Sequence, residues 1–70
     1  MISIESNFKI DIKPYRRAMR ISKYKLSTLV GMSKSSITEL EQGKRIPSAL
    51  TLHKLSLALN CKMEDLIKIA

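Results

Sequence analysis

The sequence has one cysteine and one histidine among its 70 residues. A single cysteine excludes an intrachain disulfide, and no Cys/His cluster has the spacing of a zinc site. Cys61 stands among apolar residues, which favours a buried thiol in a reducing cytoplasm over a reactive one. The two glycines form no phosphate-binding loop, and no pair of carboxylates indicates acid–base chemistry. We therefore expect no enzyme, no cofactor and no metal.

Long hydrophobic runs are also missing. The longest apolar runs fall far short of the ~20 residues that a bilayer-spanning helix needs. Residues 1–10 have no basic start followed by an apolar block, so no signal peptide is predicted. A chain of this length forms one domain, which buries only about 60% of the surface exposed when unfolded. We expect a cytoplasmic protein with no membrane partner.

Acidic residues are scarce, because six Asp and Glu stand against thirteen Lys and Arg, for a formal net charge of +7. An excess of this size favours a polyanionic partner, either nucleic acid or an anionic membrane. A basic surface that only confers solubility is the alternative. The basic residues do not follow one long amphipathic helix, which disfavours a membrane surface.

The first residues alternate in character, with apolar residues at even positions and Ser6 as the exception. This period of two predicts a strand, and residues 67–70 are a possible partner for it. The pattern then becomes helical. We expect one domain over residues 1–70, with an N-terminal strand or arm over 1–11 and a helical bundle over 12–69. The alternating residues are Ile2, Ile4, Phe8, Ile10 and Ile12.

Five short helices are predicted, the first over about residues 12–20, in an all-α fold with a short N-terminal strand. Four of them follow a residue suited to an N-cap: Asp11, Ser22, Ser33 and Ser48. Gly31, Gly43 and Asn60 can adopt the left-handed conformation that ends a helix. The expected inner faces are Tyr15, Arg16 and Met19; Leu26, Leu29 and Val30; Ile37 and Leu40; Leu52, Leu55, Ser56 and Leu59; and Met63, Leu66 and Ile67.

The second and third helices are separated by the short segment Gly31-Met32-Ser33. Glycine at the bend lets two helices cross steeply, and Ser27 faces the crossing, where only a small side chain fits. This is the spacing of a helix-turn-helix, whose second helix enters the major groove of DNA. An ordinary helical hairpin is the alternative.

Residues 12–67 resemble the Xre family of helix-turn-helix regulators, typified by phage Cro and repressor proteins. The most specific part is S-K-S-S-I-T-E-L-E-Q-G-K-R-I-P, where a serine-capped helix ends in Glu before Gly, a basic residue and Pro. Residues 55–66 match the family's C-terminal pattern. The resemblance implies a compact repressor-like DNA-binding domain, and it implies that Arg16 and Glu41 form a structural salt bridge.

The resemblance also implies which residues contact DNA. The family's base readers match Lys34, Ser35 and Glu39, with Ser36 and Thr38 nearby, on a recognition helix of about Ser33–Glu41. Lysine can donate to guanine and glutamate can accept from cytosine, although Glu39 could instead be an ordinary surface acid. Phosphate contacts are expected at the start of the second helix and after the third, from Ser22, Lys23, Gln42, Lys44 and Arg45.

Family members usually bind in pairs on near-palindromic sites, so a homodimer is expected. Leu50 and Leu57 lie seven positions apart on the fourth helix and, with Ile67 and Ile69, could form an exposed apolar stripe. The alternative is that the N-terminal strand covers them within one chain. Departures from the family pattern are Arg20 for glycine, Lys62 for a cap residue, and His53, expected to be half-buried, for an aliphatic residue.

The expected function is sequence-specific binding of double-stranded DNA by a transcriptional regulator, with no small-molecule ligand. A protein-interaction module that modulates another regulator without binding DNA is the alternative. Basic residues at positions 23, 34, 44 and 45 argue against a loss of DNA binding.

Overall fold

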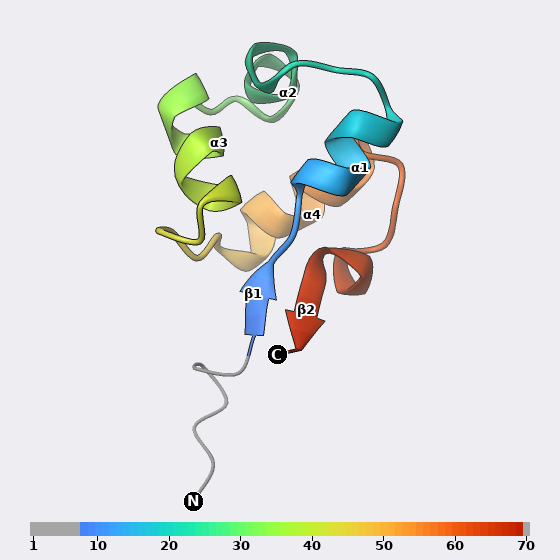
Figure 1. The fold of residues 1–70 in the computed structure, drawn as a ribbon. Coiled ribbons are helices and arrows are strands. Elements are labelled where there is room, and N and C mark those ends of the chain that lie inside the picture. The colour runs from blue at the N-terminus through green and yellow to red at the C-terminus, as the bar shows by residue number, and fades with distance from the viewer. Residues whose placement is uncertain (1–7, 70) are drawn as a thin grey trace, which may run out of the picture.

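The chain runs from a short strand through four α-helices and returns to a second strand beside the first (Figure 1). The computed structural model describes residues 8–69, so the expected strand positions Ile2 and Ile4 lie outside the described part. The elements in order are β1 (Phe8–Ile10), α1 (Lys13–Ala18), α2 (Lys23–Val30), α3 (Lys34–Glu41), α4 (Ala49–Ala58), the 3-10 helix η2 (Met63–Leu66) and β2 (Ile67–Ile69).

The two strands form an antiparallel pair in which Lys9 stands opposite Lys68 and Ile10 opposite Ile67. The Asp11 N–H continues this ladder by donating to the Leu66 carbonyl at 2.8 Å. The expected pairing of the first strand with the end of the chain is therefore confirmed. This strand pairing joins the segment before α1 to the segment after α4 by hydrogen bonds.

One hydrophobic core lies between the helices. The α2 helix packs on both α3 and α4, and η2 packs on α4. A helix buries apolar residues three and four positions apart, which places Leu26 and Val30 of α2 in this core. The buried apolar residues are Ile10, Ile12, Leu26, Val30, Ile37, Leu40, Leu52, Leu55, Leu59 and Leu66.

Serine begins three of the helices as expected. The hydroxyl oxygens of Ser22, Ser33 and Ser48 each accept the N–H of the residue three positions later, at 3.0–3.2 Å. Each bond satisfies one of the N–H groups that a helix start leaves without a partner. Left-handed residues follow the helices at Gly31 and Gly43, with φ of 71° and 76°.

Two non-glycine residues also have a left-handed backbone. Arg20 follows α1 with φ of 58°, and Asn60 follows α4 with φ of 54°. Each precedes a residue whose N–H reaches back to the carbonyl five positions earlier, from Ile21 to Arg16 and from Cys61 to Ser56. This is the Schellman arrangement, which usually contains glycine because a Cβ is strained there.

The predicted cap Asp11 is wrong. α1 follows Ile12, which makes no side-chain cap bond, and the Asp11 carboxylate instead lies 3.3 Å from the Lys68 Nζ. The strand pairing holds the Asp11 backbone beside β2, so its side chain faces the lysine of that strand. α1 is also shorter than predicted, and Met19 at its end is 42% exposed instead of inward-facing.

The predicted fifth helix is a single 3-10 turn, because pairing with β1 draws Ile67 into β2. Lys62 stands where the family has a cap residue, but the start of this turn is still held by hydrogen bonds. The Asp65 carboxylate accepts the Lys62 N–H at 3.0 Å, and the Asp65 N–H donates to the Lys62 carbonyl at 3.0 Å. The described residues therefore form four α-helices, one 3-10 helix and a two-stranded sheet.

Three predicted burials are also wrong or incomplete. Leu29 is 53% exposed, because the buried side of α2 is formed by Leu26, Ser27 and Val30. His53 is exposed on α4, since Leu52 and Leu55 occupy the core side of that helix. Cys61 is half-buried, because the chain leaves the core where α4 ends.

Candidate nucleic-acid interface

α2, the turn after it and α3 form one unit, in which the two helices pack against each other (Figure 1). Gly31 ends α2 in a left-handed conformation, and the Met32 N–H donates to the Ser27 carbonyl at 2.9 Å. Ser27 is buried, and its hydroxyl donates to the Tyr24 carbonyl at 2.6 Å. The small buried serine and the left-handed glycine are two of the features from which the sequence predicted a helix-turn-helix.

The outward face of α3 is polar. Ile37 and Leu40 are buried on the opposite side, so the helix presents its other residues away from the core. Five of these were predicted to contact bases. Lys34 and Ser35 are exposed, and Ser36, Thr38 and Glu39 are half-buried.

The guanidinium of Arg45 lies on this face of α3. Its Nη1 donates to Ser36 Oγ at 2.9 Å, and its Nη2 lies 3.2 Å from Glu39 Oε1. The Ser36 hydroxyl also accepts from Ser33 Oγ, the helix cap, at 3.0 Å. Arg45 was expected to extend toward phosphate, and the sequence offered no signal for its contacts with two α3 residues nine and six positions earlier.

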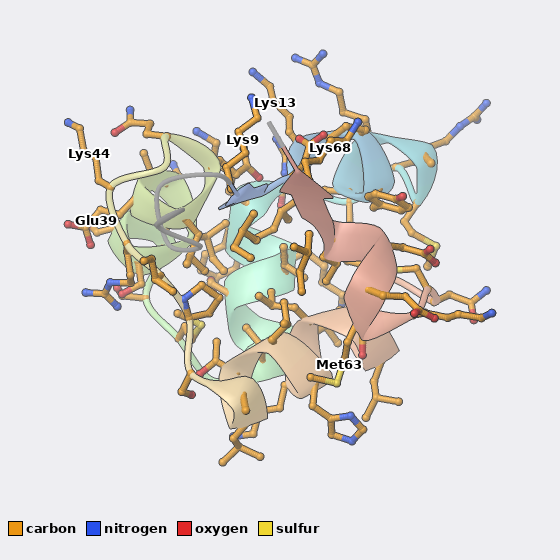
Figure 2. All side chains as sticks on the ribbon, turned by 90° about the horizontal axis from the view of Figure 1, so that it is seen from below. Lys9, Lys13, Glu39, Lys44, Met63 and Lys68 are labelled. Atoms are coloured by element: carbon orange, nitrogen blue, oxygen red, sulfur yellow. The ribbon has the colours of Figure 1, made fainter. Side chains whose placement is uncertain are left out.

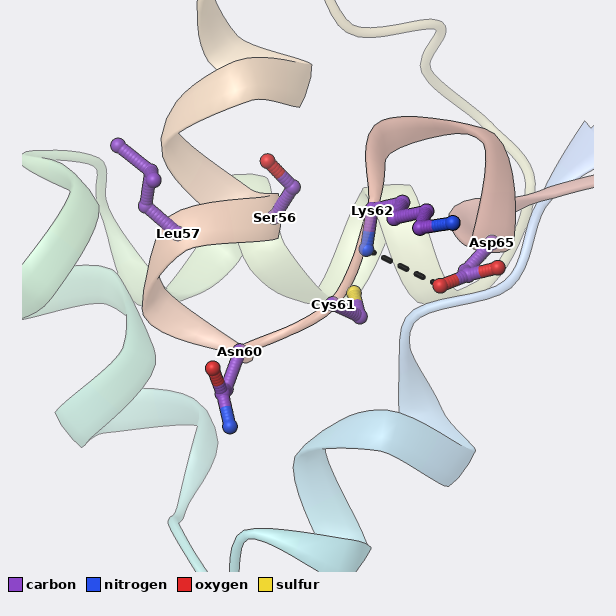
Figure 3. A pocket seen from close by; sticks show the side chains of 6 residues that line it. All are labelled: Ser56, Leu57, Asn60, Cys61, Lys62 and Asp65. Atoms are coloured by element: carbon purple, nitrogen blue, oxygen red, sulfur yellow. Dashed lines mark hydrogen bonds between the residues drawn. The ribbon is translucent and has the colours of Figure 1, made fainter.

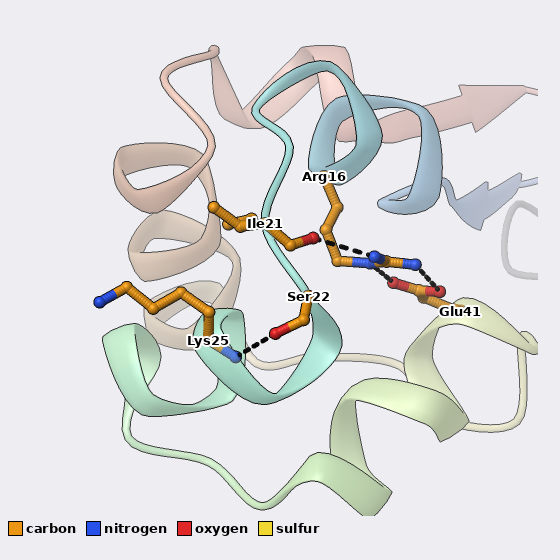
Figure 4. Close-up of polar contacts among 5 residues, drawn as sticks. All are labelled: Arg16, Ile21, Ser22, Lys25 and Glu41. Atoms are coloured by element: carbon orange, nitrogen blue, oxygen red, sulfur yellow. Dashed lines mark hydrogen bonds and ion pairs between the residues drawn. The ribbon is translucent and has the colours of Figure 1, made fainter.

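The other predicted phosphate contacts lie around α3. Ser22 caps α2 through the Lys25 N–H (Figure 4), and the adjacent Lys23 is half-buried. Gln42 and Lys44 are exposed in the turn that follows α3. The lysine extends outward on the same side of the molecule as Glu39 (Figure 2).

α1 is tied to the end of α3 by an ion pair. Arg16 Nε donates to Glu41 Oε2 at 2.7 Å and Arg16 Nη2 to Glu41 Oε1 at 3.3 Å (Figure 4). A third donor, Nη1, bonds to the Ile21 carbonyl at 3.0 Å in the link before α2. The predicted structural salt bridge is confirmed, and it joins three parts of the chain around one guanidinium.

Part of the positive charge lies away from α2 and α3. Lys9, Lys13 and Lys68 extend from one side of the strand pair and the start of α1 (Figure 2). Asp11 pairs with Lys68 at 3.3 Å. Sequence reasoning did not find this group, because it depends on the strand register that places Lys9 opposite Lys68.

An open hollow of about 390 Å³ lies at the end of α4 (Figure 3). Its lining is part polar and part apolar, and it includes Cys61, whose pKa is raised by burial and, to a lesser extent, by the Asp65 carboxylate. Among the described residues, no group of three or more His, Cys, Asp or Glu side chains could bind a metal ion. The lining residues are Ser56, Leu57, Asn60, Cys61, Lys62 and Asp65.

The α4 leucines expected at a dimer interface are at the surface. Leu50 is 63% exposed and Leu57 is 68% exposed. β1 pairs with β2 and leaves both of them accessible. Ile67 is half-buried against the core, and the side chain of Ile69 lies outside the described part of the chain.

A capped helix with a polar outward face, fixed against a preceding helix by a tight turn, defines the helix-turn-helix class of DNA-binding proteins. A family model described as Helix-turn-helix matches residues 12–66. The chain belongs to this family of Xre/Cro-like DNA-binding regulators.

Two solved structures share the fold. The restriction-modification controller protein C.AhdI from Aeromonas hydrophila is 29% identical, with a TM-score of 0.74, over 79% of this chain and 83% of that one. The DNA-binding domain of the P22 C2 repressor is 31% identical, with a TM-score of 0.76, over 79% of this chain and 72% of that one. A search of curated proteins finds no match. None of the helices within residues 8–69 is long and apolar enough to cross a membrane.

Proposed function

We propose that this chain is a transcriptional regulator that binds a specific sequence in double-stranded DNA by placing α3 in the major groove. The observation that carries the proposal is the construction of α3. Its outward face is polar, its start is capped by Ser33, and its end is braced through Glu41. A helix that is rigid and polar outward can bring several donors to base edges at once.

The expected base-reading residues all lie on the accessible side of α3, as the proposal requires. Lys34 and Ser35, in its first turn, are the most accessible of them. Recognition helices commonly approach bases with their N-terminal residues. Thr38, one turn later, offers a hydroxyl and a methyl group to the same groove.

Phosphate contacts are proposed at the two ends of the unit. The start of α2, at Ser22 and Lys23, offers N–H groups and a cation to one backbone strand. Gln42 and Lys44 offer an amide and a cation beyond α3. The two cations, Lys23 and Lys44, would neutralise about two phosphates per subunit, so log K should fall with log salt concentration at a slope of roughly −2 per subunit.

A homodimer on a near-palindromic operator is proposed because one α3 reads few base pairs. Leu50 and Leu57 support it, since large apolar side chains more than half exposed on one helix are typical of partner sites. These leucines are also the observation that favours the alternative, an interaction module that binds another regulator instead of DNA. A measurement of DNA binding distinguishes the two functions, because only the regulator binds DNA.

The test is selection from a random-sequence duplex library, followed by shift assays of the selected duplex over a range of salt concentrations. We expect enrichment of a near-palindrome whose affinity falls steeply with salt. A Lys34→Ala variant should lose preference at the base pairs that Lys34 reads. Binding to the selected duplex no tighter than to a scrambled one at low salt would overturn the proposal and favour the interaction module.

A further inference from the structure

The position of Arg45 decides what it can contact. Its guanidinium carries five N–H donors, and the contacts with Ser36 Oγ and Glu39 Oε1 use two of them. The other three remain available on a side chain that is 45% exposed. Arg45 is therefore held against α3 and can still donate outward.

The geometry of α3 places this guanidinium at one edge of the reading face. Successive residues of an α-helix are turned by about 100°, and the buried Ile37 and Leu40 define the core side. Ser35 then lies opposite the core. Lys34 and Thr38 flank it on one side, and Ser36 and Glu39 flank it on the other. Arg45, bonded to this second pair, supplies the cation that the second edge otherwise lacks.

We propose that Arg45 reads a guanine in the major groove and that Glu39 and Ser36 are the residues that position it. This inference rests on the proposed DNA-binding function and replaces the phosphate contact expected for Arg45. Arginine donates to guanine O6 and N7 through a planar pair of N–H groups, a geometry that requires a fixed guanidinium.

Pairing also changes the role of Glu39. A lone carboxylate facing the groove would be repelled by the phosphates, whereas a carboxylate paired with Arg45 is neutralised where it stands. Its Oε1 contacts the guanidinium, so the proposal assigns this side chain to orienting a donor instead of accepting from cytosine. The Ser36 oxygen already accepts from Ser33 and Arg45.

The experiment compares base-preference profiles, obtained by library selection, for the full chain and three variants: Arg45→Ala, Glu39→Gln and the control Lys44→Ala. Lys44 is the matched control, because it is an exposed cation in the same turn with no salt bridge among the described residues. Circular dichroism establishes that each variant is folded, and shift assays at several salt concentrations give the slope of log K.

We expect Arg45→Ala to reduce discrimination for guanine at one base pair per half-site by roughly five- to one-hundredfold. Glu39→Gln should reduce discrimination at the same base pair by a smaller factor, because the arginine is still present but is held less firmly. Lys44→Ala should weaken binding to all sequences and reduce the magnitude of the salt slope by about 0.9, with an unchanged profile.

Two results would overturn the inference. In one, Arg45→Ala behaves like Lys44→Ala, with a lower salt slope and the original base preference. In the other, Glu39→Gln alters a base pair different from the one that Arg45→Ala alters, as direct readout by Glu39 requires. Both leave the unmodified chain sequence-specific, whereas failure of the proposed function removes sequence preference from the unmodified chain itself.

Discussion

Arg16 Nε lies 2.7 Å from Glu41 Oε2, in a pair whose side chains are only 12% and 5% exposed. Removing one member of a buried ion pair costs roughly 3–5 kcal/mol, because the other charge is left without compensation. We expect Glu41→Gln to lower the free energy of unfolding by about 3 kcal/mol. Urea denaturation followed by circular dichroism measures this loss, as a lower midpoint at an unchanged slope.

The control for this substitution is Glu64→Gln, at an exposed glutamate of η2. It should change stability by less than about 0.5 kcal/mol. The double variant Arg16→Met/Glu41→Leu should recover part of the loss, since it removes both charges and fills their space with apolar atoms. Equal losses for Glu41→Gln and Glu64→Gln would show that the pair contributes nothing to the fold.

Arg20→Gly should stabilise the protein. Arg20 has φ of 58°, a left-handed conformation that costs a residue with a Cβ roughly 1–2 kcal/mol. Glycine adopts it without that strain but adds freedom to the unfolded chain, so we expect a net gain of about 0.5–1 kcal/mol in thermal unfolding. The matched control is Arg17→Gly, the same substitution inside α1, which should destabilise by about 1 kcal/mol.

Local signals explain why much of the fold could be predicted. Ser22, Ser33 and Ser48 cap helices by bonding three residues ahead, so the sequence around each one is sufficient. The helix-turn-helix depends on Ser27 and Gly31, which lie within it. These features, together with the family resemblance, predicted expected readers that lie on the outward side of α3.

Distant contacts explain what could not be predicted. Asp is a residue type that often caps helices, but the strand pairing places the Asp11 carboxylate beside Lys68, with which it forms an ion pair. Ile67 continues a helical pattern, but pairing with β1 makes it a strand residue. Arg45 reaches Ser36 and Glu39 only because the turn after α3 folds back on the helix.

Leu57→Asp should convert the proposed dimer into monomers while circular dichroism stays unchanged. Leu57 is 68% exposed in the single chain, so a charge there costs little within the monomer but is desolvated in an apolar interface. Sedimentation equilibrium measures the mass. Leu29→Asp is the control, because Leu29 is also exposed, at 53%, but lies on α2.

A dimer that survives Leu57→Asp would exclude this face of α4 as the interface. If Leu29→Asp abolishes the dimer to the same extent, then the contact lies elsewhere or the loss is a general effect of introducing a charge. A monomeric unmodified chain at micromolar concentration in the presence of its selected duplex would contradict the homodimer itself.

Cys61 should react slowly with iodoacetamide. Burial, and then the Asp65 carboxylate, raise its thiol pKa, so the thiolate fraction at a given pH is smaller than in the unfolded chain. The raised pKa also implies that folding favours the protonated thiol. Stability from this source is present below the ordinary thiol pKa and is lost as pH rises through the folded-state pKa.

Alkylation rates from pH 7 to 10, in the native protein and in urea, test this directly. The native rate should rise at higher pH than the unfolded rate, and Asp65→Asn should bring the two closer. The asparagine oxygen can still accept the Lys62 N–H, so the turn is preserved. Identical pH profiles for the native and unfolded chains would contradict the raised pKa.

The most direct test of the central claim, that α3 and its flanks bind DNA, is an NMR titration of the labelled chain with the selected duplex. We predict that the largest amide shift changes occur in residues 22–25 and 33–45, which are the start of α2, the recognition helix and the turn after it. Changes confined to α4 and the strand pair, with α3 unaffected at saturation, would contradict the account.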